Sequence, residues 1–74
     1  MIAERVKKVV ANCLGCDSDV RDEANFIDDL GADSLDLVEL TLELEGEFNI
    51  EIPDEDVEKL ETVGQVIEYV KGKV

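Results

Sequence analysis

The sequence predicts an all-α fold, a four-helix bundle with a short third helix and a long loop between helices 1 and 2. Apolar residues recur at intervals of three and four in several segments, which is the spacing of one helix face. No segment shows the strict alternation of apolar and polar residues that is typical of a strand. We expect the 74 residues to form one domain, residues 1–74, whose core is too small to wall a deep enzyme cleft.

The first helix is expected over residues 2–14. One of its faces collects the apolar side chains Ile2, Val6, Val9, Val10 and Cys13. Gly15 is placed to end this helix, because glycine readily adopts the left-handed conformation of a helix terminus.

The long loop is expected over residues 16–32, which are rich in Asp, Ser, Asn and Gly. Its apolar anchors to the core are expected to be Val20, Phe26, Ile27 and Leu30. Loops of this length in compact domains are usually functional or contain local structure, so we expect one helical turn within residues 25–30.

The second helix is the most regular segment, and its helical wheel divides into three faces. Asp33 is placed as its N-cap, and the helix is expected from Ser34 to about Glu47. The core face holds Leu37, Leu40, Thr41, Leu44 and Phe48, and an acidic face holds Asp36, Glu39, Glu43 and Glu47. The third face is again apolar and holds Leu35, Val38 and Leu42. Since one apolar face is enough for packing, the third face either docks a partner or is covered by neighbouring helices.

Two further helices complete the predicted bundle. After an extended link, Asp54 is expected to cap a short helix that ends near Leu60. Thr62 is expected to cap the last helix, and Lys71 and Gly72 suit its carboxyl end. The inner face of this last helix holds Val63, Val66, Ile67 and Val70.

Negative charge dominates the middle of the chain. The sequence has 20 acidic and 7 basic residues, a net charge of −13, and the stretch from Asp17 to Glu58 holds 17 acids and one base, Arg21. Such a surface repels nucleic acid and attracts proteins that carry an Arg/Lys patch, although solubility alone is an alternative reason for it. Self-repulsion leads us to expect a monomer whose stability rises with salt or divalent cations.

Nothing in the sequence indicates membrane insertion. The longest apolar run is only a few residues, and the N-terminus lacks the charged-then-apolar order of a signal peptide. We therefore expect a cytoplasmic protein.

The cysteines and serines do not point to catalysis. Cys13 and Cys16 have a C-x-x-C spacing, but a zinc site needs two more ligands, and the chain has no histidine and no third cysteine. A thiol redox motif would follow a strand, whereas this pair follows a helical segment, so we expect a structural or incidental role for it. Ser34 has no histidine and no nearby base to activate it, which argues against a serine hydrolase.

A calcium site is a further alternative, because Asp17, Asp19, Asp22 and Asp28 cluster in the long loop. An EF-hand loop that starts at Asp17 needs Asp or Asn, then Gly, where this sequence has Arg21 and Asp22. We therefore predict no catalytic residue and no metal site.

Ser34 is the candidate functional residue, because it directly follows the N-cap of the second helix. The free N–H groups and the positive end of the helix dipole favour an attached phosphodiester at this position. A side chain in the first turn also projects outward, where a modifying enzyme can reach it. Taken alone, however, a serine at a helix start is an ordinary feature.

The surrounding residues resemble those of acyl carrier proteins. Residues 26–40 (FIDDLGADSLDLVEL) look like the phosphopantetheine-attachment segment of that family, with Asp33-Ser34-Leu35 at its centre. Residues 47–56 (EFNIEIPDED) look like the segment that follows the second helix, and the resemblance covers essentially the whole chain. Peptidyl carriers usually have a histidine before the serine and are less acidic. Thr41, Leu42, Glu43 and Gly46 depart from the residues that are common in the family.

The resemblance implies a carrier and not an enzyme. Ser34, flanked by Asp33 and Leu35, would hold 4′-phosphopantetheine that a phosphopantetheinyl transferase takes from coenzyme A with Mg²⁺. The arm would carry acyl chains as thioesters between enzymes of fatty acid synthesis, or of related polyketide or lipid synthesis. Residues that match the family's docking positions for basic-patched enzymes are Leu35, Asp36, Val38, Glu39, Leu42, Glu45 and Glu47. The implied acyl pocket is lined by Phe26, Leu40, Leu44, Ile52, Val57, Leu60 and Ile67.

A second hypothesis shares the charge and the extra apolar face. In it the chain is an acidic interaction module, a degenerate carrier without a prosthetic group. The intact Asp33-Ser34-Leu35 favours the carrier, because a degenerate copy would have no reason to keep it.

Overall fold

The computed structural model describes residues 2–15 and 20–74 and confirms the predicted all-α bundle. The helices are α1 (Ile2–Leu14), α2 (Ser34–Phe48), the short α3 (Asp54–Val57) and α4 (Val63–Lys73). Over those same residues the β-structure is limited to one isolated antiparallel bridge, between Asn25 and Thr62. None of the helices described is long and apolar enough to cross a membrane.

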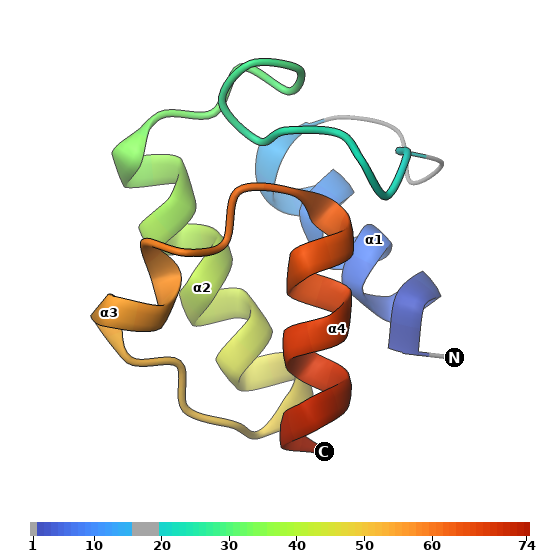
Figure 1. Cartoon of the computed structure of the whole chain (residues 1–74), viewed down its shortest axis with the longest axis vertical. Helices are drawn as coiled ribbons and strands as arrows, with labels where there is room; N and C mark the ends of the chain where they lie inside the picture. The colour runs from blue at the N-terminus through green and yellow to red at the C-terminus, as the bar shows by residue number, and fades with distance from the viewer. Residues whose placement is uncertain (1, 16–19) are drawn as a thin grey trace.

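The core forms where α1 packs against both α2 and α4 (Figure 1). The side chains of Val6 and Val10 on α1 are fully buried, and they share the interior with Leu40 and Leu44 of α2. The remaining buried apolar residues of the described chain are Phe26, Ala32, Phe48, Ile52, Val63, Val66, Ile67 and Val70. The predicted inner faces of α1, α2 and α4 therefore meet in one core, as an amphipathic helix requires.

The helix ends follow the local signals of the sequence. Gly15 has φ 71° and donates its N–H to the Ala11 carbonyl at 2.8 Å, which ends α1 as predicted. At the start of α4 the Thr62 hydroxyl accepts the N–H of Gln65 at 3.3 Å, and Oε1 of Gln65 accepts the N–H of Thr62 at 3.0 Å. This reciprocal capping box confirms Thr62 as the N-cap.

The bounds of α3 differ from those expected. The N-cap is Pro53 and not Asp54, and the helix ends at Val57 instead of near Leu60. The carbonyl of Pro53 accepts the N–H of Asp56 at 2.9 Å, so the helical hydrogen bonds begin one residue earlier than a side-chain cap at Asp54 would place them. Beyond Val57 the bonds change to the i to i+3 type, with Leu60 N–H donating to the Val57 carbonyl at 3.1 Å, and the α-helix stops there.

The connection from residue 20 to residue 33 arches over one end of the bundle, beside the first turns of α2 and α4 (Figure 1). The predicted helical turn is present: the Asn25 carbonyl accepts the N–H of Asp29 at 2.9 Å. Phe26 is 1% exposed and is the main anchor of the connection, while Val20 and Leu30 are half-buried against the core. Ile27 was expected to be an anchor as well, and this was wrong, because its side chain is 56% exposed.

Three backbone hydrogen bonds fix this connection to the start of α4. The N–H of Phe26 donates to the Glu61 carbonyl at 3.0 Å, and the N–H of Val63 donates to the Ala24 carbonyl at 3.1 Å. The N–H of Gly64 donates to the Asp22 carbonyl at 2.6 Å. A Cβ at residue 64 would lie 3.0 Å from that same carbonyl oxygen, so the close approach depends on glycine.

Two glycines give a matched test of this fold. Gly46 lies in the last turns of α2 with open space where a Cβ would be, so Gly46→Ala should raise the free energy of unfolding by about 1 kcal/mol, or about 4–8 °C in melting temperature. Gly64→Ala should instead lower the melting temperature, because the methyl group would push the backbone of Asp22 away. Thermal unfolding followed by circular dichroism measures both, and a Gly46→Ala protein that melts no higher than the wild type would contradict the argument.

Candidate functional site

Ser34 is the first residue of α2, and its orientation is fixed by the residues around it. Asp33 is the N-cap, and its Oδ1 accepts the N–H of Asp36 at 2.9 Å. Oδ2 of Asp36 in turn accepts the N–H of Asp33 at 3.1 Å, which completes a capping box. Gly31 (φ 70°) turns the chain into this cap, and the Ala32 N–H donates to the Phe26 carbonyl at 2.8 Å. The start of α2 is therefore fixed by the capping box within the helix and by a hydrogen bond in the loop that precedes it.

The Ser34 side chain is exposed at this fixed start. The Asp33 side chain accepts the N–H of Asp36, and the Asp33 carbonyl accepts the N–H of Leu37. Within the described structure this leaves the N–H groups of Ser34 and Leu35 without a hydrogen bond. Two free N–H groups and the positive helix end can thus contact an oxyanion attached at Ser34. This arrangement favours a phosphodiester on the serine oxygen.

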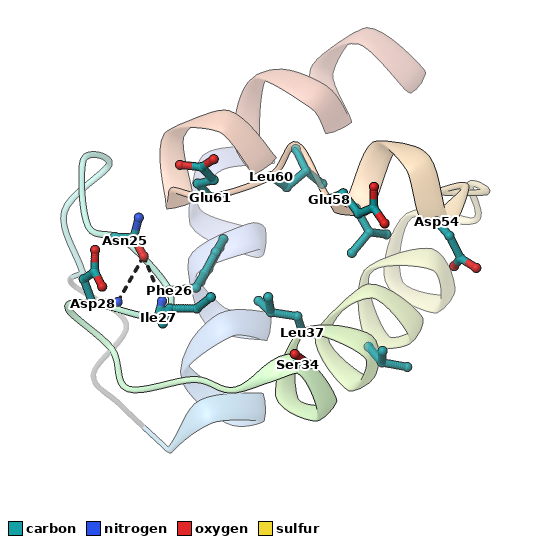
Figure 2. Close-up of a pocket in the computed structure, with 12 residues that line it drawn as sticks. Asn25, Phe26, Ile27, Asp28, Ser34, Leu37, Asp54, Glu58, Leu60 and Glu61 are labelled. Atoms are coloured by element: carbon teal, nitrogen blue, oxygen red, sulfur yellow. Dashed lines mark hydrogen bonds between the residues drawn. The ribbon is translucent and has the colours of Figure 1, made fainter.

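A cleft of about 630 Å³ opens beside Ser34. In Figure 2 the side chains of Phe26 and Leu37 point into this space, and Ser34 lies at its edge, where α2 begins. The apolar part of the lining consists of Phe26, Ile27, Leu37, Val38, Val57 and Leu60. The acidic part consists of Asp28, Asp54, Glu58 and Glu61. Such a lining favours an uncharged, partly apolar chain over a second phosphate.

The loop wall of this cleft is stiffened by Asn25. Its Oδ1 accepts the N–H groups of Ile27 at 2.9 Å and of Asp28 at 3.0 Å, drawn as dashed lines in Figure 2. The side chain of Asp29 closes the same turn by accepting the N–H of Asn25 at 2.7 Å. The turn is thus held by its own polar side chains, as is common for Asn and Asp.

A small internal cavity of about 10 Å³ lies behind the cleft, and Phe26, Leu37, Val57 and Leu60 line both spaces. The internal cavity is completed by Leu40, Thr41, Leu44 and Val66. Of the seven residues expected for an acyl pocket, Phe26, Leu40, Leu44, Val57 and Leu60 line this cavity. Ile52 and Ile67 are buried in the core but line neither space.

The sequence had singled out Thr41, a departure from the family, as able to narrow or polarise this pocket, and Thr41 does line the cavity. Sequence reasoning left Leu37 and Val66 out, although their places on the inner faces of α2 and α4 could have indicated them. The Thr41 hydroxyl donates to the Leu37 carbonyl at 2.8 Å, so its polar group is satisfied within α2.

Two side-chain hydrogen bonds hold the segment that carries Val57 against the rest of the bundle. Oε2 of Glu45 accepts the N–H of Ile52 at 2.8 Å, and the hydroxyl of Tyr69 donates to Oδ2 of Asp56 at 2.6 Å. None of the four residues of α3 is fully buried, and Val57 is half-buried against the core, so these hydrogen bonds and the burial of Ile52 add to a small apolar contact. The outer wall of the cleft is consequently the least supported part of the site.

The third face of α2 is exposed, with 67% of Leu35, 52% of Val38 and 61% of Leu42 accessible to solvent. The alternative that neighbouring helices cover this face is therefore wrong, and the three residues form an exposed apolar stripe. Glu39 is exposed alongside it.

Three of the other expected docking acids have internal partners. Glu47 pairs with the Arg5 guanidinium at 2.9 Å, Glu45 binds the backbone at Ile52, and Asp36 belongs to the cap of α2. These acids therefore have structural roles of their own, and their part in docking stays a prediction.

The two weaker sequence hypotheses involve residues that lie outside the described part of the chain, namely Cys16, Asp17 and Asp19. Cys13 is half-buried on α1. Burial raises the pKa of its thiol above the ordinary value, and the carboxylates of Glu39, Glu43 and Asp36 raise it further. Such a thiol is a poor nucleophile at neutral pH.

Comparison with known proteins agrees with this site. Residues 4–70 match the family model described as a phosphopantetheine attachment site. The chain is therefore a phosphopantetheine-binding protein, and Ser34 lies within the matched region.

The relatives define the family more narrowly. The chain is 54% identical over 73 residues to the acyl carrier protein of Clostridium acetobutylicum, covering 97% of this chain and 95% of that protein. The solved acyl carrier protein of Enterococcus faecalis superposes with a TM-score of 0.82 at 42% identity, covering 99% and 94% of the two chains. A provisionally assigned acyl carrier protein of Mycobacterium tuberculosis gives 0.91 at 35% identity and 97% coverage of both. The chain belongs to the acyl carrier protein family.

Tyr69 provides a spectroscopic test of the α3 attachment, because it is the only tyrosine in the sequence. Burial, followed by the hydrogen bond and charge of Asp56, raises its pKa from 10.0 to about 12. The folded state therefore favours the neutral phenol, so the stabilisation is complete below pH 10 and is lost as the pH rises toward 12. Tyrosinate absorbance should titrate near pH 12 in the wild type and at a lower pH in Asp56→Ala, which removes the hydrogen bond and the charge of Asp56 but leaves the burial. Identical titration curves for the two proteins would show that the Asp56 contact is not formed.

Proposed function

We propose that this acyl carrier is loaded at Ser34, whose oxygen forms the phosphodiester to 4′-phosphopantetheine. The observation that carries the proposal is an exposed serine at a capped helix start with two free N–H groups, beside an apolar-lined cleft. The bound group would supply a thiol that holds an acyl chain as a thioester. The chain itself would position that arm and shelter the cargo.

The loading step requires a second protein. The Ser34 oxygen attacks the phosphorus that carries the pantetheine half of coenzyme A, the new P–O bond forms, and the bond to the departing 3′,5′-ADP breaks. The serine proton must pass to a base, and this chain has no histidine to take it. A phosphopantetheinyl transferase with Mg²⁺ would supply the base, so the chain acts as substrate and not as catalyst.

The partners that we propose are this transferase and the acyl-transfer enzymes of fatty acid synthesis, each presenting a basic patch. The exposed apolar stripe of α2 beside the exposed Glu39 supports this, because apolar surface supplies burial and charge supplies orientation. The pathway served, whether fatty acid, polyketide or another lipid, is left open by these features. The monomeric state and the cytoplasmic location remain predictions from the sequence.

The loading site is tested by intact-mass measurement after incubation with coenzyme A, Mg²⁺ and a broad-specificity phosphopantetheinyl transferase. One phosphopantetheine adduct, mapped to the peptide that contains Ser34, is the expected result. Ser34→Ala should take no adduct and should keep the helical circular dichroism of the wild type, because the side chain is exposed and the cap is formed by Asp33 and Asp36. A folded wild-type protein that takes no adduct would favour the degenerate interaction module.

We also propose that the acyl chain enters behind the cleft by displacing α3. The internal cavity of about 10 Å³ cannot hold an acyl chain as it stands, and α3 forms a wall that has no fully buried residue. Breaking the bonds of Tyr69 to Asp56 and of Glu45 to Ile52 costs about 3–6 kcal/mol, since both involve a charged group. Each buried CH₂ group returns about 0.8 kcal/mol, so about four to eight methylenes offset the opening.

This balance predicts a threshold in chain length. The melting temperature of the acylated protein should change little for the shortest chains and then rise with each added methylene. Tyr69→Phe removes one of the two bonds and should move the onset to shorter chains by about two to four methylenes. A rise that begins with the shortest chain in both proteins would show that α3 is not the barrier.

A further inference from the structure

A second groove runs between α1 and α2, apart from the cleft beside Ser34. Its volume is about 460 Å³, and none of its lining residues belongs to the cleft. Its lining consists of Val9, Asn12 and Cys13 from α1 and Glu39, Leu42, Glu43 and Glu47 from α2. Leu42, one of the three residues of the exposed apolar stripe, thus belongs to the groove as well.

The groove combines apolar walls with uncompensated negative charge. Leu42 and Val9 provide the apolar surface, and Glu39 and Glu43 stand one helical turn apart on α2. Within the described residues no cation lies within salt-bridge distance of Glu39 or Glu43. Cys13 on the α1 wall lies close enough to both carboxylates for them, after burial, to raise the pKa of its thiol.

The end of the groove at Glu47 already shows how a cation binds here. Arg5 of α1 pairs with Glu47 at 2.9 Å, and its guanidinium lies 4.6 Å from the centre of the Phe48 ring. A cationic head is therefore held by a carboxylate while it rests against apolar surface. Glu43 and Glu39 lie one and two turns closer to Ser34 on the same helix. Within the described chain, neither carboxylate has a cation partner like the one that Arg5 provides for Glu47.

We propose that this groove receives an arginine or lysine side chain from the basic patch of the phosphopantetheinyl transferase, so that α1 as well as α2 forms the docking surface. The stem of that side chain lies along Val9 and Leu42, and its charged head lies between Glu39 and Glu43. A second copy of this chain does not fit the groove, because each copy carries a net charge of −13. The inference rests on the proposed loading of Ser34, because the transferase is the enzyme that acts there.

Three variants that each change the net charge by +1 test the groove in the loading assay. Glu43→Gln removes a carboxylate from the groove, and Asn12→Arg places a cation of the chain's own into it. Glu68→Gln is the matched control on α4, because Glu68 is 76% exposed and does not line the groove. We expect the first two to raise the KM for this chain by about three- to tenfold with kcat unchanged, and the control to change KM by less than about twofold. Equal KM values for the three variants would overturn the proposal.

Cys13 reports on the groove directly. In a Cys16→Ser background without coenzyme A, saturating transferase should slow the N-ethylmaleimide alkylation of Cys13 by at least about fivefold, measured by intact mass. Unchanged alkylation would contradict the proposal, and so would protection by Mg²⁺ alone, because the groove would then be a metal site. The two proposals fail separately. A wild type that is never modified removes the loading at Ser34, whereas normal loading with an unprotected Cys13 removes only the groove.

Discussion

The attachment of residues 22–26 to the first turn of α4 is the constraint on which the site depends. Without it, the connection between α1 and α2 would lose its backbone hydrogen bonds to α4, and the segment that leads into Ser34 would be free to move. The bond from Gly64 to the Asp22 carbonyl and the bonds on either side of Asn25 remove that freedom. Phe26 then enters the core and lines both the cleft and the cavity behind it. The same contact therefore positions Ser34 and shapes the cavity that we propose for the cargo.

The acidic composition is compatible with this fold because many carboxylates act as hydrogen-bond acceptors. Asp33 and Asp36 cap α2, Asp29 closes the loop turn, and Glu45 and Asp56 tie down the segment around α3. Each of these groups accepts an N–H or O–H, so its charge is stabilised by a fixed dipole instead of by a cation, of which the chain has few. Glu39 and Glu43 have no such partner among the described residues, and we therefore assign them to the recognition of a basic partner. Structural and recognition roles are thus divided among residues of one type.

Local signals in the sequence were enough for the helices, most caps and the candidate serine. Asp33, Thr62 and Gly15 act through neighbours within four residues, and the stripe of Leu35, Val38 and Leu42 follows from helix periodicity alone. What sequence could not give depends on contacts between distant segments. Ile27 was placed in the core because it is apolar, but Phe26 beside it took that position. The end of α3, the bond from Glu45 to Ile52 and the groove around Cys13 all arise from packing that no local pattern encodes.

The three faces of α2 explain why so small a chain can both hold a cargo and offer it to other proteins. Its core face ends in the cavity at Leu40 and Leu44, and its N-terminus presents Ser34 at the mouth of the cleft. Its outer faces carry the apolar stripe and the acids of the groove. Because one helix sets all of these positions, a partner that binds the outer faces would find the proposed attachment point, Ser34, at a fixed place on α2. The helix that we propose moves when cargo enters or leaves is α3, which lies off this helix and has no buried residue. A carrier built in this way can vary its cargo without changing the surface that its partners recognise.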